Sequence, residues 1–186
     1  MDAPVTGWWR RNRLALIALA VLVPVTTATL VGVAWSRYYL YEPTIPKDAA
    51  EGETVELAEA TWGPVRAVDV TDGGELTAPS DARVIAVAVP VDPHGDSPSC
   101  FSPVLVEQDT GRRWEEMTTE LGIPYSSEEP TSCTKPEEDE NGDPGPIVPY
   151  EIIVGYIVPE DAEGPFWVEV SEIDSYPSFI RFSVEP

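Results

Sequence analysis

Residues 14–36 read LALIALAVLVPVTTATLVGVAWS, a run of 23 residues without a charged side chain. As an α-helix with a rise of about 1.5 Å per residue, this run would be roughly 34 Å long, enough to cross a hydrocarbon core of about 30 Å. Pro24 and Gly32 would weaken a helix in water, but both are tolerated in lipid. The run therefore predicts one transmembrane helix that contacts the lipid bilayer through residues 14–36.

The residues on either side of this run suit the two surfaces of a membrane. Amphipathic rings prefer the membrane–water interface, where one end of the ring is apolar and the other is wet. Basic side chains resist translocation, and only Arg37 follows the run closely. We therefore expect an N-terminus in the cytoplasm, a single span in the plasma membrane and an extracytoplasmic remainder. The expected interfacial residues are Trp8, Trp9, Arg10, Arg11, Arg13, Trp35, Tyr38, Tyr39 and Tyr41.

A cleaved signal peptide is the competing interpretation of the same segment. It has a basic region and an apolar region, Gly32-Val33-Ala34 could serve as a small-residue cleavage site, and Arg10-Arg11 is a twin-arginine pair. The apolar run is longer than a usual signal h-region, and the bulky Trp35 directly follows the candidate site. These two features favour a retained signal-anchor. Under either interpretation the rest of the chain is exported.

Charge is divided unevenly along the 186 residues. Residues 1–40 carry four Arg and one Asp, whereas residues 41–186 carry seven basic and 32 acidic side chains, a net charge of −25. So negative a segment repels phosphate backbones, which excludes nucleic acid as a partner. One His and two Cys cannot supply four zinc ligands, which excludes a His/Cys zinc site.

The exported part predicts an all-β domain. Residues 37–53 carry Pro, Gly and charge without periodicity and are expected to form a stalk, and the domain then occupies 54–186. Its short runs are rich in Val, Ile and aromatic residues, and no convincing helix follows residue 40. Their spacing and alternation fit an antiparallel two-sheet sandwich of the immunoglobulin-like kind. The expected strands are 54–61, 65–70, 82–91, 104–106, 113–115, 150–158, 166–170 and 179–184.

The two cysteines, Cys100 and Cys133, are most simply a disulfide in an exported domain. Closing a loop of that length is worth about 3–4 kcal/mol in the chain-entropy model. A redox-active thiol pair is the alternative. It is disfavoured because the sequence has no C-x-x-C motif and no helix N-terminus that would lower a thiol pKa. The bond at Cys133 should fix one point of a long, polar, Pro-rich loop over residues 121–149.

Few other residues suggest chemistry, and each has a structural explanation. His94 lies in VDPHGDSP, has no G-x-S-x-G partner motif and is expected to be an exposed turn residue. Asp139, Asn141 and Asp143 alternate as Ca²⁺ ligands would, but Pro144 replaces the turn Gly and Tyr150 the closing Glu, which favours a solvated acidic loop. Trp62, Trp114 and Trp167 could stack on a sugar, but strand positions favour packing. A carboxylate-dependent hydrolase would need a pair of catalytic acids, but with 32 acidic residues available no pair stands out in the sequence.

The layout resembles that of uncharacterised actinobacterial single-pass membrane proteins with an immunoglobulin-like extracytoplasmic domain. The similarity is carried by WWRRNR (8–13) before the apolar span and by CFSPVLVEQDTGRRWEE (100–116) followed by Cys133. The stretch PYEIIVGYIVPE (149–160) is similar to a late strand of immunoglobulin-like accessory domains in Gram-positive envelope proteins. The resemblance implies a sandwich without catalytic residues.

These inferences predict a membrane-anchored, non-enzymatic accessory or scaffolding protein. Its acidic ectodomain would bind a membrane or envelope protein at the outer face of the plasma membrane, without a cofactor. The alternative is an extracytoplasmic ligand-binding or sensing module for Ca²⁺ or a cationic peptide, using the acidic residues of 128–143, and a carboxylate-dependent hydrolase is the third hypothesis. The expected organisation is a tail (1–13), a transmembrane helix (14–36), a stalk (37–53) and a β-sandwich domain (54–186).

Overall fold

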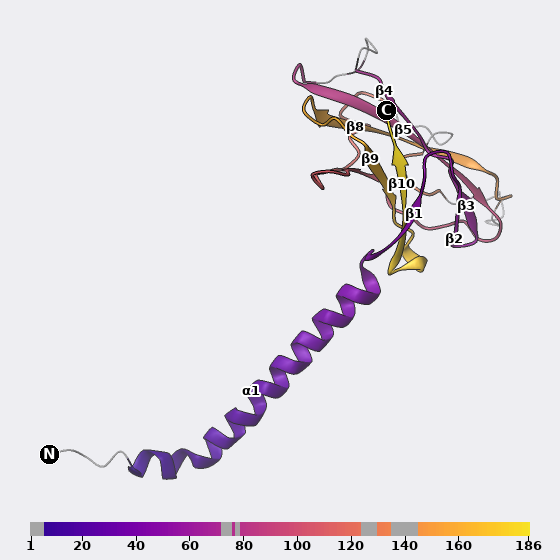
Figure 1. The fold of residues 1–186 in the computed structure, drawn as a ribbon. Helices are drawn as coiled ribbons and strands as arrows, with labels where there is room; N and C mark the ends of the chain where they lie inside the picture. Colours follow the sequence, from indigo (N-terminus) through magenta and orange to yellow (C-terminus); the bar gives the residue numbers. More distant parts are fainter. Residues whose placement is uncertain (1–5, 72–75, 77–78, 124–129, 135–144) are drawn as a thin grey trace. The chain divides into compact units, whose positions relative to one another are not determined.

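The computed structural model describes residues 6–71, 76, 79–123, 130–134 and 145–186. The chain forms two compact units, Met1–Glu42 and Pro43–Pro186. Among the described residues, the first unit holds the helix α1 and the second holds the strands (Figure 1).

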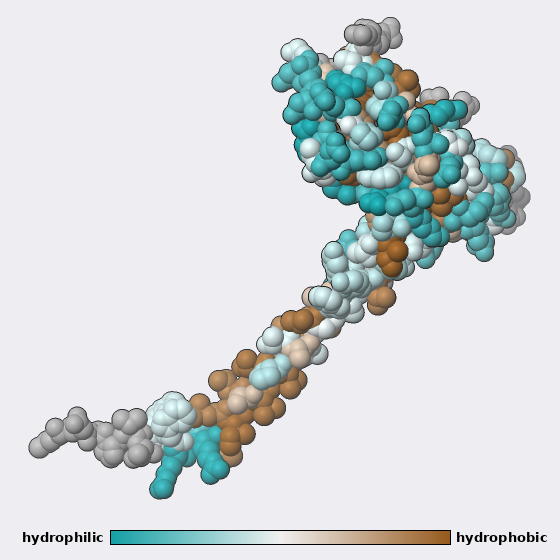
Figure 2. Space-filling model, in the orientation of Figure 1, coloured by the Kyte–Doolittle hydropathy of each residue, from teal (hydrophilic) through white to brown (hydrophobic). Residues whose placement is uncertain are grey.

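Helix α1 spans Thr6–Tyr41, so it continues beyond both ends of the predicted span. Residues Gly7–Leu40 form a stretch long and apolar enough to cross a membrane, and none of it is buried within the protein. In Figure 2 the hydrophobic surface of α1 is concentrated in its N-terminal half, and paler residues are mixed in over the remainder. Pro24 lies inside the helix, and just beyond it the Thr27 hydroxyl donates a hydrogen bond to the Val23 carbonyl (2.9 Å). Pro24 has no amide hydrogen to donate to the Ala20 carbonyl four residues earlier, so it removes one hydrogen bond from the helix.

The second unit contains two β-sheets. Sheet A has the order β1-β10-β9-β6-β7, and sheet B has the order β2-β3-β5-β4 with β8 also paired to β5. A short 3₁₀ turn, η1 (Ile173–Ser175), connects β9 and β10. The strands of sheet A are β1 (Ile45–Ala49), β10 (Ser178–Val184), β9 (Phe166–Val170), β6 (Val104–Glu107) and β7 (Arg113–Trp114). The strands of sheet B are β2 (Val55–Leu57), β3 (Ala60–Trp62), β5 (Ala82–Pro93), β4 (Arg66–Asp69) and β8 (Tyr150–Pro159).

Both sheets contribute one face to a single hydrophobic core. Alternate residues of β5 and β8 are buried in sheet B, as period-2 alternation requires, and alternate residues of β9 and β10 are buried in sheet A. This confirms the prediction of a strand-rich domain with two sheets. The core includes Trp62, Ile85, Val87, Val89, Val91, Leu105, Ile152, Val154, Tyr156, Phe166, Val168, Ile180 and Phe182.

The pairing is not antiparallel throughout, which corrects the predicted arrangement. Strand β1 pairs in parallel with β10, with Ile45 opposite Ser178 and Ala49 opposite Phe182. Residues 45–49, which the sequence assigned to a stalk, therefore belong to sheet A. The sequence carries no signal for β1 because an edge strand exposes most of its side chains, and only Ala49 of its five residues is buried.

A single strand was predicted over residues 54–61, and this prediction was wrong. The segment forms the hairpin of β2 and β3, with Ala58 and Glu59 at positive φ (52° and 54°) in the turn. Neither residue is the Gly or Asn that marks such a turn in a sequence. The chain then bends at Gly63, whose φ is +86° and where a Cβ would lie 2.9 Å from the Glu53 carbonyl oxygen. Only glycine fits there without a backbone shift.

Candidate functional site

Two clusters of exposed aromatic rings lie near the ends of α1. Trp8 and Trp9 form an edge-to-face pair with ring centroids 5.5 Å apart. Tyr39 contacts both Trp35 (4.9 Å) and Tyr38 (5.3 Å). All five rings are exposed. Trp9 and Trp35 are about 39 Å apart along a helix of 1.5 Å rise, close to the full thickness of a bilayer with its headgroups. The rings are thus spaced as the two interfacial belts would be.

A disulfide joins Cys100 and Cys133, as the sequence predicts, with the two Cα atoms 5.1 Å apart. The Cys133 amide donates to the Cys100 Sγ at 3.2 Å. Cys100 lies just before β6 and forms an isolated bridge with Glu172, just after β9. The disulfide therefore fastens residues 130–134 to one end of sheet A. It does not connect core strands of the two sheets, as the disulfide of antibody domains does.

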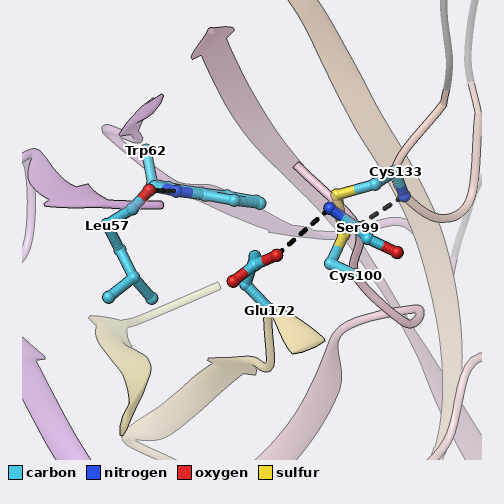
Figure 3. The surroundings of a disulfide bond; sticks show 6 residues. All are labelled: Leu57, Trp62, Ser99, Cys100, Cys133 and Glu172. Carbon is cyan, nitrogen blue, oxygen red and sulfur yellow. Dashed lines mark hydrogen bonds between the residues drawn. A yellow bond between two sulfur atoms is a disulfide. The ribbon is translucent and has the colours of Figure 1, made fainter. Parts of the chain in front are cut away.

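A buried carboxylate lies beside this disulfide (Figure 3). The Glu172 side chain is almost fully buried, and its Oε1 accepts a hydrogen bond from the Ser99 amide at 3.3 Å. Its Oε2 has no hydrogen-bond partner among the described residues. The Ile173 amide donates to the Ser99 carbonyl at 2.8 Å. Segments 99–100 and 172–173 are thus held together by backbone and side-chain hydrogen bonds, and the disulfide links Cys100 of the first segment to Cys133.

A second polar cluster connects two loops at the other end of β6. Glu107 is buried, and Arg112 donates to it through Nε (2.9 Å to Oε2) and Nη2 (3.2 Å to Oε1). Arg112 Nη1 also contacts the exposed Asp161 at 2.9 Å. The hydrogen bonds from Arg112, and then that from the Thr110 hydroxyl, lower the pKa of Glu107 below its usual value. Sequence reasoning missed this cluster because 32 acids hide any one specific carboxylate.

The lowered pKa of Glu107 predicts that the domain loses stability in acid. A group whose pKa is lower when folded stabilises the fold above its unfolded pKa, about 4, and loses that contribution as pH falls through the folded pKa. Asp69 acts in the same direction, since the Thr71 hydroxyl and then Arg83 lower its pKa. The midpoint of urea unfolding, followed by tryptophan fluorescence, should therefore fall as the pH drops below about 5 and continue to fall through the lowered pKa values of the folded protein. Glu107→Gln should flatten this slope, and the exposed Glu160→Gln should not; equal slopes would contradict the assignment.

The three candidate tryptophans do not form a common stacking surface. Trp62 is fully buried in the core, and its Nε1 donates to the Leu57 carbonyl at 2.9 Å. Trp114 packs against the same core, edge to face with Phe166 at 6.2 Å. Trp167 alternates with the core residues of β9 and has the Arg181 guanidinium 5.0 Å from its ring centroid. All three therefore serve packing.

The remaining candidates from the sequence are His94 and the potential metal ligands. His94 follows β5 directly and is half exposed, with Nε2 2.6 Å from the Thr61 hydroxyl, which in turn donates to Glu56. Within the described ranges, no three His, Cys, Asp or Glu residues gather in a way that could hold a metal ion. The Ca²⁺ candidates Asp139, Asn141 and Asp143 lie outside the described residues.

No protein-family model, curated protein or solved structure matches this chain. The resemblance to actinobacterial membrane proteins therefore stays a prediction. The chain combines an exposed apolar helix that carries two aromatic clusters with a two-sheet domain that contains a disulfide.

Proposed function

We propose that this protein is a single-pass, non-enzymatic accessory or scaffolding protein of the plasma membrane. Its N-terminus lies in the cytoplasm, and its acidic domain, an immunoglobulin-like sandwich, binds a membrane or envelope protein outside. The observation that carries this proposal is α1: a helix of membrane-spanning length, with none of it buried and an aromatic cluster near each end. A helix that is apolar all round needs lipid or other helices around it.

The side chains of the domain suit binding better than catalysis. The buried polar groups of the described residues are largely engaged in structure: Glu107 with Arg112, Glu169 with Arg113 (2.7 Å), and the Tyr156 hydroxyl with the Pro103 carbonyl (2.8 Å). A disulfide suits an oxidising exterior compartment. A net negative surface favours partners with basic patches by raising their association rate.

An anchor would raise the effective concentration of the domain near other membrane proteins. The partner should therefore co-purify with the full chain after cross-linking in intact membranes and extraction in mild detergent. A chain that lacks residues 1–41 and is exported by a cleavable signal serves as the control and should retain much less partner. A full chain that always runs alone and monomeric would contradict the proposal.

The positive-inside bias predicts the orientation of the chain. A reporter fused after Pro186 that is active only outside the cytoplasm should be active in the native sequence. Replacing Arg10, Arg11 and Arg13 by Asn removes the bias, leaving Arg37 as the basic residue nearest the span. We expect this variant to lose a large part of the reporter activity, and Arg37→Asn to keep all of it. Equal activity in the triple variant would show that another signal orients the helix.

A further inference from the structure

Three large apolar side chains are exposed at one end of sheet A. Strands β1, β10 and β6 begin at this end and β9 finishes there, as their pairing shows. Ile45 opens β1 and is 55% exposed, and Ile173 lies in η1 between β9 and β10 and is 39% exposed. Phe101 follows Cys100, which pairs with Glu172, and is 60% exposed. These three residues are called the apolar tip.

The backbone of the apolar tip is held firmly. The amides of Thr44 and Ile45 both donate to the Pro177 carbonyl, each at 2.9 Å. The Ile173 amide donates to the Ser99 carbonyl at 2.8 Å, and the disulfide at Cys100 fixes the residue next to Phe101. Three apolar side chains on one ordered frame lose little entropy when they become buried together.

We propose that the apolar tip inserts into the headgroup region of the lipid bilayer, an inference that depends on the membrane anchoring proposed above. Only residues 42–44 separate the last residue of α1 from Ile45. Such a short connection leaves the chain little length with which to lift β1 away from the membrane surface. The tip is therefore the part of the domain that meets lipid most often.

The size of the apolar tip favours lipid over a protein partner. Stable protein interfaces bury about 800 Å² on each side, which three side chains do not supply. Binding at a bilayer interface scales with the apolar area that becomes buried between headgroups and acyl chains, to which a few aromatic and aliphatic side chains can contribute. The exposed Asp174 directly follows Ile173 of the tip, and residues 44–45, 99–101 and 173–177 include no basic residue. The tip should therefore prefer zwitterionic to anionic lipid.

The test uses the full chain in phosphatidylcholine nanodiscs at one chain per disc. Lipid with a nitroxide near the top of its acyl chain should broaden the amide signals of Ile45, Phe101 and Ile173 strongly. It should leave the signal of Val68 on β4 unchanged. Phe101→Glu should reduce the broadening at Ile173 roughly ten-fold, the change expected when one large apolar side chain no longer partitions into lipid. The matched control is Val68→Glu, since Val68 is 57% exposed.

The outcomes separate this inference from the proposed function. Broadening in α1 without broadening at the tip would overturn the lipid contact and keep the anchor, and no broadening in either would overturn both. The lipid contact would also be overturned if the amide signals of the tip broadened no more than that of Val68. It would be overturned as well if the broadening at the tip persisted in both Phe101→Glu and Ile173→Glu. A tip contact that appears only at two chains per disc would assign the surface to a second copy instead.

Discussion

Trp62→Ala is expected to destabilise the two-sheet domain by about 3–5 kcal/mol, the range for removing a large aromatic side chain from a core. Trp62 is fully buried in β3, where it pairs with Val55 of β2 and Val91 of β5. Its loss leaves a cavity in the core and removes the hydrogen bond to the Leu57 carbonyl. The measurement is urea unfolding of the full chain in mild detergent, followed by near-ultraviolet circular dichroism.

Trp62→Phe separates packing from hydrogen bonding. It keeps most of the ring volume and loses the bond to Leu57, so it should cost about 1–3 kcal/mol, clearly less than the alanine change. Trp167→Ala is a second control, because Trp167 is only partly buried and lies outside the core cluster. If Trp62→Ala and Trp167→Ala cost the same, the placement of Trp62 in the core would be wrong.

Removing the disulfide should cost about 3–4 kcal/mol, the loop-closure value for cysteines 33 positions apart. The double variant Cys100→Ala/Cys133→Ala frees residues 130–134 from sheet A. Hydrogen exchange should rise first at the Ile153 amide, which donates to the Pro130 carbonyl, and at the Ile173 amide, which donates to the Ser99 carbonyl. Amides in the centre of β5 should change only with global stability.

Reductant provides the control for the disulfide prediction. It should shift the unfolding midpoint of the native chain to that of the double variant, and it should leave the double variant unchanged. If reductant broke the disulfide and the unfolding midpoint of the native chain did not change, the disulfide would have no stabilising role. The lipid contact of the apolar tip should also weaken in the double variant, since Phe101 would lose its fixed neighbour.

Much of the fold could be predicted because its signals are local. An uncharged run of membrane-spanning length and the alternation in β5 and β8 each depend on a single segment of sequence, and both are present in the structure. The hairpin of β2 and β3 was missed because Ala58 and Glu59 occupy positive φ without a glycine or asparagine. Strand β1 was missed because its partner, β10, lies at the far end of the chain and β1 buries only Ala49.

The candidate sites also differ in whether a local stretch of sequence could predict them. The cysteine pair and the aromatic clusters of α1 could be predicted because their residue types are rare or sharply positioned in the sequence. The Glu107–Arg112–Asp161 cluster could not, because its members are common side chains brought together by the folding of two separate loops. The apolar tip combines residues 45, 101 and 173, and no local pattern connects them.

The parallel pairing of β1 with β10 determines how the domain would respond to mechanical force. The chain enters β1 from the side of the helix, and β10 leads out toward the C-terminus in the same direction. A pull between the membrane and the C-terminus would slide the two strands lengthwise past each other. All the hydrogen bonds between them would then carry the load together, whereas an antiparallel hairpin pulled at its ends opens one bond at a time. The domain is thus built to resist tension applied between the start of β1 and the end of β10.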